Sequence, residues 1–206
     1  MPSSAPRVFL LSPARCDGQR ARMLLRPDAA FSLAVRLRSL EGAAIGEVFA
    51  FLSGLYFRGK LAYATAFAAP PPRVPPALVI TTDRGLVGPE EAVGPDDLRT
   101  FAGVDLASAD PRFTTPFRRD LERLAAASSP DTQFILLGSI ATGKYTDSML
   151  DVLGEQLLFP SDFVGRGDMS RGGLLLRRVD EGRELDYVSV NGAIRRGSRP
   201  PRLPRR

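Results

Sequence analysis

The 206-residue chain contains no histidine and no tryptophan, and its single cysteine is Cys16. Histidine is the usual general base near neutral pH, so catalytic sites of the Ser-His-Asp and Cys-His kinds are excluded within this chain. Zinc sites of the Cys/His kind need several such ligands, and one cysteine cannot form an internal disulfide. Chemistry here would therefore depend on Asp, Glu, Lys, Tyr, Ser or Thr, alone or with a hard metal ion bound by carboxylates.

Long apolar runs are also absent from the sequence. No segment approaches the roughly 20 apolar residues that a membrane span needs. The apolar run that starts at Val8 is too short for a secretion signal and is typical of a first strand. We therefore expect a cytosolic protein without a membrane segment. With 44% apolar and 25% charged residues, the composition is that of an ordinary globular domain.

Lysine is scarce, since only Lys60 and Lys144 occur among the 28 basic residues and the rest are arginine. A lysine that persists in such a background is a candidate for a role that needs a compact ammonium group, which a guanidinium imitates poorly. Both lysines follow a glycine. Two residues can also persist by chance, so the pattern only marks these positions for attention.

The formal net charge of +5 comes from residues 195–206, which contain six arginines and no acid. The preceding residues are nearly neutral as a group. An Arg/Pro/Gly composition cannot form a core, so we predict a disordered basic tail at 195–206. Such a tail either binds nucleic acid through its phosphates or is a solvated segment without a partner.

Apolar runs typical of strands alternate with helical patterns along residues 1–194. We expect strands at 8–12, 47–53, 77–82, 133–137, 156–159 and 184–190, and helices at 28–40, 55–68, 115–129, 146–154 and 174–178. This alternation predicts a single α/β domain with a mostly parallel sheet of about five or six strands flanked by helices.

In such folds, ligands bind outside the carboxyl ends of the strands. The segments expected to leave those ends are 12–17, 53–56, 82–85, 138–144 and 161–171. Together they contain Gly-Lys and Gly-Arg elements and several acidic residues. Their convergence is the main argument from the sequence for a functional site.

The segment that runs from Gly138 to Tyr145 reads GSIATGKY and nearly matches the phosphate-binding loop G-x-x-x-x-G-K-[ST]. Gly138, Ser139 and Gly143 could direct backbone amides at an anion, and Lys144 could add a charge. Tyr145, however, replaces the small hydroxyl that holds magnesium in a nucleotide triphosphatase. Three interpretations remain: a triphosphatase loop, another contact to a phosphate or base, and a structural turn.

A second candidate stretch follows the fifth expected strand and includes VGRGDMSRGG. Arg166 and Arg171 are candidates for holding phosphate. Asp162 and Asp168 are candidates for general bases, for metal ligands or for readers of a base edge. The alternative is a tight turn in which Asp168 caps a helix. Asp83, after the third expected strand, is likewise either a catalytic residue or a residue that holds its turn.

Four stretches, taken in order, resemble a bacterial family related to YaaA, the peroxide-stress-associated group. They are SGLYFRGKLAYA at 53–64, VITTDRGLVGPEEAVGPDDL at 79–98, GSIATGKYTDSMLDVL at 138–153 and LLFPSDFVGRG at 157–167. Where the family has Ala-Lys-His, this chain has Thr82-Asp83-Arg84, so a role of that Lys or His does not carry over. The resemblance implies an α/β fold and a link with nucleic acid.

The sequence thus predicts a nucleotide- or nucleic-acid-binding protein that acts on a base or nucleotide at the strand carboxyl ends. We assign no cofactor and no metal ligand. The rival hypothesis is a non-catalytic interaction protein that binds through its Arg/Pro tail. A third is a phosphotransferase that uses a degenerate phosphate loop. The oligomeric state cannot be deduced from these patterns.

Overall fold

A six-stranded, mostly parallel sheet with the order β4-β3-β1-β6-β7-β8 forms the centre of the computed structural model, which describes residues 5–104, 109–141, 143 and 145–201. The four inner strands are parallel to one another, and the two edge strands are antiparallel to their neighbours. A separate pair of short strands, β2 and β5, forms a small antiparallel sheet. The strands are β1 (Arg7–Leu11), β2 (Ala43–Ala44), β3 (Ala77–Ile80), β4 (Leu86–Val87), β5 (Ala92–Val93), β6 (Gln133–Leu137), β7 (Leu157–Pro160) and β8 (Tyr187–Ser189).

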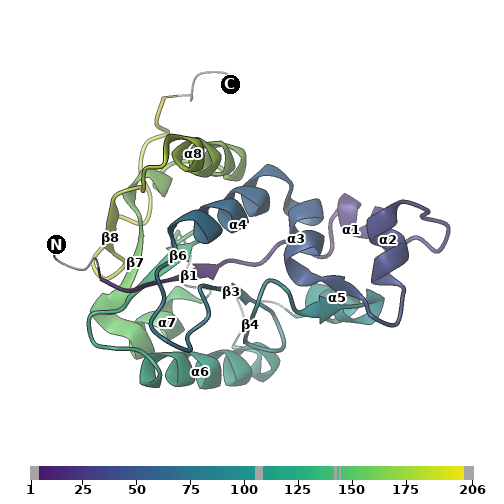
Figure 1. Cartoon of the computed structure of the whole chain (residues 1–206), viewed down its shortest axis with the longest axis horizontal. Helices are drawn as coiled ribbons and strands as arrows, with labels where there is room; N and C mark the ends of the chain where they lie inside the picture. The colour runs from purple at the N-terminus through teal and green to yellow at the C-terminus, as the bar shows by residue number, and fades with distance from the viewer. Residues whose placement is uncertain (1–4, 105–108, 142, 144, 202–206) are drawn as a thin grey trace.

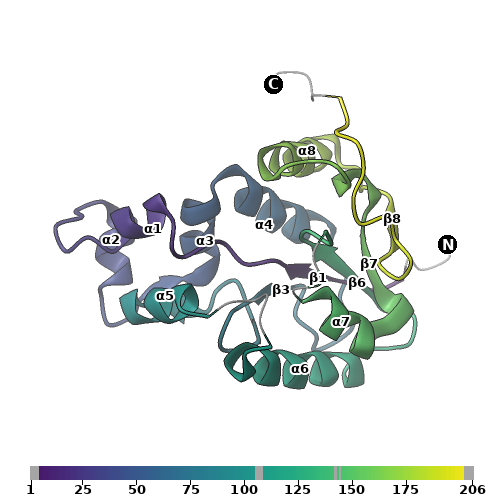
Figure 2. The same ribbon diagram turned by 180° about the vertical axis from the view of Figure 1, so that it is seen from behind.

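Helices cover both faces of the sheet, and a group of them extends beyond the carboxyl end of β1 (Figures 1 and 2). Helices α4 and α8 lie on one side of the sheet, and α6 and α7 lie on the other (Figure 1). The helices are α1 (Gln19–Leu24), α2 (Ser32–Leu37), α3 (Ile45–Ser53), α4 (Leu55–Phe67), α5 (Pro95–Ala102), α6 (Pro111–Ala126), α7 (Thr146–Leu153) and α8 (Asp168–Glu181). Short 3₁₀ turns span Gly154–Gln156 and Ser161–Phe163.

The core lies on the inner strands, and this explains their continuous apolar runs. Strand β3 is buried at every position, and β1 and β6 are buried at every position but the first. Parallel strands covered by helices on both faces have no solvent side, so their sequences do not alternate. The α/β fold predicted from the sequence is confirmed. Among the described residues, no helix is both long and apolar enough to cross a membrane.

The expected strand at 47–53 is wrong, since these residues form the larger part of helix α3. The buried residues of α3 are Ile45, Gly46, Val48 and Phe49, which recur at the spacing of one helical face. A short apolar run without alternation fits a buried strand or a buried helix equally well. Packing against the neighbouring helices therefore determined that these residues form a helix.

Three helix boundaries also differ from the prediction. Helix α2 begins at Ser32, and Asp28, the first residue of the expected helix, pairs with Arg26 at 2.7 Å outside it. Helix α6 begins at Pro111, because the Asp110 carboxylate accepts a hydrogen bond from the Arg112 amide at 2.9 Å and caps the helix there.

Helix α8 begins at Asp168 rather than at residue 174. Gly172 and Gly173 lie inside it, and paired glycines weaken the helical signal of a sequence.

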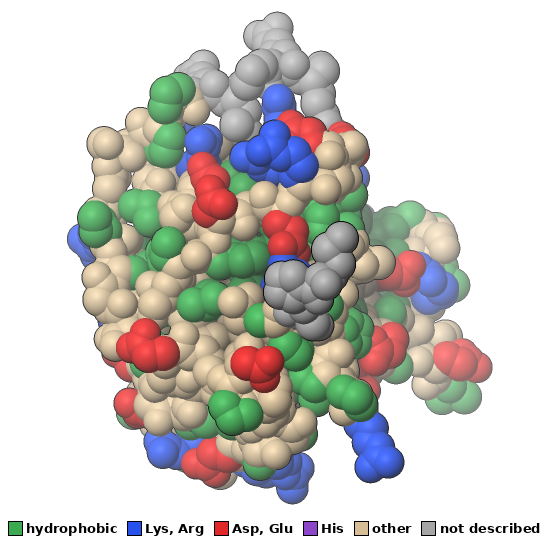
Figure 3. All heavy atoms as spheres, turned by 60° about the vertical axis from the view of Figure 1, so that its left-hand side comes forward, with side chains coloured by type: hydrophobic (Ala, Val, Ile, Leu, Met, Phe, Trp, Pro, Cys, Tyr) green, Lys and Arg blue, Asp and Glu red, His purple; other side chains and the backbone are tan. Residues whose placement is uncertain are grey.

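The described part of the predicted tail, 195–201, contacts the body of the protein. Arg195 pairs with Asp147 at 3.4 Å, and the Arg166 guanidinium donates to the Pro201 carbonyl at 3.5 Å. Residues 202–206 lie outside the described residues, so the prediction of a disordered tail stays a prediction. On the face shown in Figure 3, acidic and basic side chains are interspersed rather than gathered by sign.

Helices α4 and α8 approach each other so closely that neither has room for a side chain at the contact. A Cβ atom on Gly59 would lie 2.8 Å from the Gly172 carbonyl oxygen. A Cβ atom on Gly172 would lie 2.6 Å from the Leu55 carbonyl oxygen and 2.7 Å from the Tyr56 Cα. These neighbours are backbone atoms, which cannot turn away as a flexible side chain can. The two glycines therefore set the distance between the helices.

We predict that Gly172→Ala lowers the free energy of unfolding by about 1–3 kcal/mol, because the added methyl group forces the two backbones apart. In a helix interior without such a contact, the same change raises stability by up to about 1 kcal/mol. Urea denaturation would measure the difference. Gly103→Ala is the control, since Gly103 has a helical backbone conformation and a Cβ atom there would meet its nearest neighbour at 3.5 Å, an ordinary contact. Equal or greater stability of Gly172→Ala would contradict the close contact.

Candidate functional site

A cavity of about 920 Å³ lies at the carboxyl ends of β1, β3 and β6. Residues that follow these strands form its floor, the first turns of α4 and α8 form one wall, and the end of α5 forms another. The lining residues are Ser12, Pro13, Ala14, Arg15, Cys16, Asp17, Leu52, Ser53, Tyr56, Lys60, Thr82, Phe101, Ala102, Gly103, Val104, Ser139, Tyr145, Asp168 and Arg171. The cavity thus has the position that an open parallel sheet favours for a ligand.

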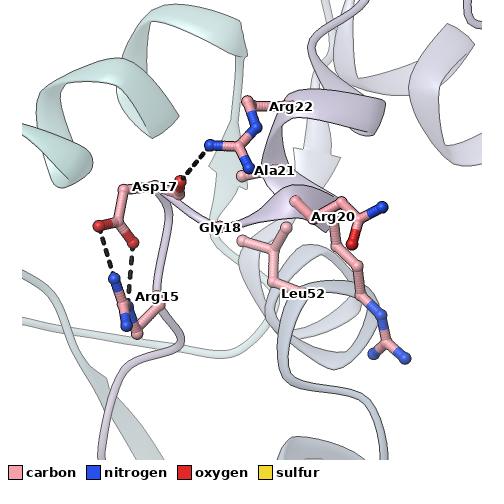
Figure 4. A pocket seen from close by; sticks show the side chains of 8 residues that line it. Arg15, Asp17, Gly18, Arg20, Ala21, Arg22 and Leu52 are labelled. Atoms are coloured by element: carbon pink, nitrogen blue, oxygen red, sulfur yellow. Dashed lines mark hydrogen bonds and ion pairs between the residues drawn. The ribbon is translucent and has the colours of Figure 1, made fainter.

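A smaller hollow of about 520 Å³ adjoins this cavity and shares Arg15, Asp17 and Leu52 with it. Figure 4 shows that its charged groups come from one short segment around α1. Arg15 forms a two-pronged ion pair with Asp17, and Arg22 donates to the Asp17 carbonyl. Because both arginines already have protein partners and lie exposed, we place the site in the larger cavity.

Lys60 is the most unusual residue of the cavity, because its side chain is only 1% exposed. Its Nζ lies 2.8 Å from the Ser12 carbonyl oxygen and 2.7 Å from the Ser12 Oγ. The ammonium also lies over the Tyr56 ring, 4.2 Å from the ring centroid. No described carboxylate forms an ion pair with it. Burial lowers the pKa of Lys60 to about 7, opposed by the charge of Asp168 and assisted by that of Arg171.

Gly138 allows Ser12 and Tyr145 to approach the end of β6. A Cβ atom on Gly138 would lie 2.8 Å from the Tyr145 hydroxyl oxygen and 2.9 Å from the Ser12 Cβ. The Tyr145 hydroxyl donates to the Ser139 carbonyl at 3.3 Å. Burial raises the pKa of Tyr145, and the adjacent Ser12 hydroxyl opposes that shift. The glycine of the loop therefore serves close packing around Ser12.

Tyr56 is only 4% exposed, and its buried hydroxyl has no hydrogen-bond partner in the part of the chain that the structure describes. Burial raises the pKa of Tyr56, and the charge of the nearby Arg171 guanidinium opposes this shift. An unpartnered buried hydroxyl costs about 1–3 kcal/mol. Because Tyr56 lines the cavity, a bound ligand or water is the natural partner for this group.

Arg171 brings a second buried cation to the cavity. Its Nε and Nη2 donate to the Phe163 carbonyl at 3.2 and 3.0 Å. Its Nη1 lies 3.7 Å from Asp168 Oδ1, beyond hydrogen-bonding distance, and the Asp168 side chain is 71% exposed. The backbone contacts fix the orientation of the guanidinium, while Nη1 keeps donor capacity for a ligand.

The structure brings together four of the residues that the sequence singled out: Ser139, Tyr145, Asp168 and Arg171 line the cavity. Gly138 lies directly behind it, and Gly143 lies against the Asp147 carboxylate. Lys144 lies outside the described residues. The strand, loop and helix expected around these glycines are present as β6 and α7.

Besides the two glycines, three charged candidates lie outside the cavity lining. Asp83 pairs with Arg84, which also pairs with Asp97 at 2.5 Å, so this network ties the end of β3 to α5. The Asp162 carbonyl accepts a hydrogen bond from Arg166 Nε at 3.0 Å. Arg166 also donates to Ser170 Oγ at 3.3 Å. These contacts hold turns and helix ends.

Sequence reasoning placed Ser12 and Tyr56 in the segments 12–17 and 53–56 at the strand ends without naming either as a site residue, and it marked Lys60 only for its rarity. Tyr56, Gly59, Lys60 and Tyr63 are all buried on α4, at the spacing of one helical face. A lysine on an apolar helical face, with no acid on the same helix, was the signal that could have identified the site.

No group of three or more acidic or cysteine side chains that could hold a metal ion occurs within the described part of the chain. Comparisons with protein-family models, with curated proteins and with solved structures found no match. The resemblance to the YaaA-related group therefore stays a prediction, and the argument for function rests on the geometry of the cavity.

The depressed pKa of Lys60 predicts a pH dependence of stability. The folded pKa is about 7, whereas an unfolded lysine titrates near 10.4. Between these values the unfolded chain binds a proton that the folded protein lacks. The free energy of unfolding should therefore rise with pH above 7, by up to about 1.4 kcal/mol per pH unit from this residue.

Urea denaturation of the wild-type protein and of Lys60→Met at pH 7, 8 and 9 would measure this contribution. The difference between the two proteins cancels groups that both contain, such as Cys16, whose pKa burial raises to about 12. We expect the stability of the wild type relative to the variant to increase with pH. A constant difference would show that the buried ammonium keeps an ordinary pKa.

Proposed function

We propose that the protein binds a nucleotide, or a nucleotide unit of a nucleic acid, in the cavity at the strand carboxyl ends. The volume of about 920 Å³ lies within the range of roughly 300–1,000 Å³ that is typical of small-molecule sites. A ligand of this class has an anionic phosphate and a flat heterocyclic base. The cavity has one wall with basic side chains and one apolar wall, and these match the phosphate and the base.

The phosphate would lie on the side of α4 and α8. Lys60 and Arg171 are both buried on this side, and the nearest acid, Asp168, is largely exposed. Helices α4, α7 and α8 each begin beside the cavity, and the N-cap residues Gly54, Tyr145 and Gly167 make no side-chain cap hydrogen bond. Their first amides and their dipoles favour an anion.

The base would lie on the side of α5. Phe101, Ala102 and Val104 form an apolar wall there, and Leu52 adds to it. Tyr56 and Tyr145 provide aromatic surfaces elsewhere in the lining. Aromatic faces bind bases by stacking without regard to sequence. The resemblance to a family linked with nucleic acid is consistent with this proposal.

The observation that carries the proposal is the Tyr56 hydroxyl, which is buried in the cavity wall and has no hydrogen-bond partner among the described residues. A stable fold rarely keeps such a group unless a ligand or water satisfies it. With its ring held against the Lys60 ammonium, the hydroxyl has a fixed position. It is therefore suited to orient a polar ligand rather than to stabilise the empty protein.

We predict that Tyr56→Phe leaves the free protein as stable as the wild type or up to about 3 kcal/mol more stable, because it removes an unsatisfied hydroxyl. The same change should weaken binding of AMP about tenfold, a loss of roughly 1.4 kcal/mol. Calorimetric titration with AMP, GMP, CMP and UMP would measure affinity, and urea denaturation would measure stability.

Tyr63→Phe on the same helix is the matched control. The Tyr63 hydroxyl accepts a hydrogen bond from the Leu185 amide at 2.7 Å and shares another with the Tyr187 hydroxyl. Its loss should lower stability and leave AMP affinity unchanged. Failure of all four nucleotides to bind the wild-type protein would refute the proposal.

The two arginines of the 166–171 segment provide a further prediction. Arg171→Gln should weaken binding of AMP at least tenfold more than binding of adenosine, because the guanidinium would contact the phosphate. Arg166→Gln should alter neither affinity, since Arg166 lies outside the lining. Equal effects of the two changes in calorimetric titration would place the phosphate elsewhere.

A further inference from the structure

We propose that Ser12 and Lys60 form a nucleophile–base pair that cleaves an ester on an anionic, nucleotide-sized ligand. This inference rests on the proposed function for the identity of the ligand, but the pair itself rests on its own geometry. The Ser12 Oγ and Lys60 Nζ are 2.7 Å apart, and both residues line the same cavity. Serine–lysine pairs replace the Ser-His-Asp arrangement in several unrelated enzymes, which suits a chain without histidine.

The surroundings of Lys60 favour the neutral amine that a general base requires. From β1, only the Ser12 carbonyl and hydroxyl contact Nζ. From α4, the Tyr56 and Phe57 rings lie 4.2 and 5.1 Å from it. From α8, Arg171 opposes protonation and the exposed Asp168 favours it. Because burial is the dominant influence, much of the amine is neutral near pH 7.

The Ser12 hydroxyl lies beside the Tyr145 oxygen and within reach of two further acceptors, which correspond to two protonation states of Lys60. It donates to the Leu137 carbonyl at 3.2 Å when Lys60 is protonated and Nζ donates to Oγ. When Lys60 is neutral, the hydroxyl can donate to Nζ without movement of the heavy atoms. The second state is the one that activates the serine.

The reaction balances without a cofactor. The Ser12 Oγ forms a bond to the acyl carbon while its proton moves to Lys60 Nζ. The bond between the acyl carbon and the leaving oxygen breaks, and that oxygen takes the proton from Nζ. Water then attacks the acyl-serine and gives a proton to Nζ, which returns it to Oγ as the carboxylic acid leaves. The buried Tyr56 hydroxyl is a donor for the polar group of the ligand during these steps.

A fluorophosphonate probe tests the pair, because it forms a phosphorus–oxygen bond to an activated serine and releases fluoride. We expect mass spectrometry of the digested wild-type protein to find one modified residue, Ser12, after reaction at pH 8. The labelling rate should rise with pH around a midpoint near 7, the pKa of Lys60. Absence of an adduct on Ser12 would overturn the proposal.

Variants separate base catalysis from mere exposure of the serine. Lys60→Met should slow labelling at least about 100-fold, the usual contribution of a general base. Ser170→Ala, outside the cavity lining, should label at the wild-type rate. Circular dichroism would show whether Lys60→Met is folded. If the variant is unfolded, the position of the adduct in the wild-type protein alone tests whether Ser12 is activated. An unchanged rate in folded Lys60→Met would refute the role of the lysine.

Protection of Ser12 from labelling by AMP tests the nucleophile–base pair separately from the proposed nucleotide binding. If both hold, saturating AMP should slow labelling of Ser12 at least tenfold. Labelling of Ser12 without binding or protection by any nucleotide would refute the proposed ligand and leave the pair intact. Nucleotide binding without labelling of Ser12 would refute the pair alone.

Discussion

The contact between α4 and α8 at Gly59 and Gly172 is the constraint on which the cavity depends. Because neither position has room for a Cβ atom, the first turn of α8 lies against the turn of α4 that bears Lys60. Arg171 precedes one of these glycines and Lys60 follows the other, so the contact brings a guanidinium and an amine to the same cavity. A wider spacing would admit water between the helices and restore the ordinary pKa of the lysine.

Two buried polar groups in the cavity wall lower the stability of the folded protein. A lysine that is 1% exposed and a buried tyrosine hydroxyl both oppose folding, because no described carboxylate contacts the first and no described group bonds the second. The apolar core beneath them, with β1, β3 and β6 almost fully buried, offsets this cost. Such local costs concentrate at functional sites, and here they meet at the edge of the sheet where an α/β fold binds its ligands.

Much of the sheet was predictable, because buried parallel strands have sequences that few other structures share. The runs at 77–82 and 133–137 became β3 and β6. Residues 47–53 were misassigned, because a short apolar run also suits a buried helix. Yet Ser53 and Tyr56, expected at the end of that strand, do line the cavity, since the junction of α3 and α4 lies beside the end of β1.

The sequence by itself determined the class of fold, the edge of the sheet at which a site would lie and the exclusion of histidine chemistry. It did so because these depend on local periodicity and on composition. Only the tertiary structure decided that Ser12, Tyr56 and Lys60 meet, that Arg171 joins them and that Asp83, Asp162 and Arg166 do not line the cavity. Contacts between residues distant in the chain depend on how closely helices pack, and two glycines set that distance without leaving a pattern that periodicity can detect.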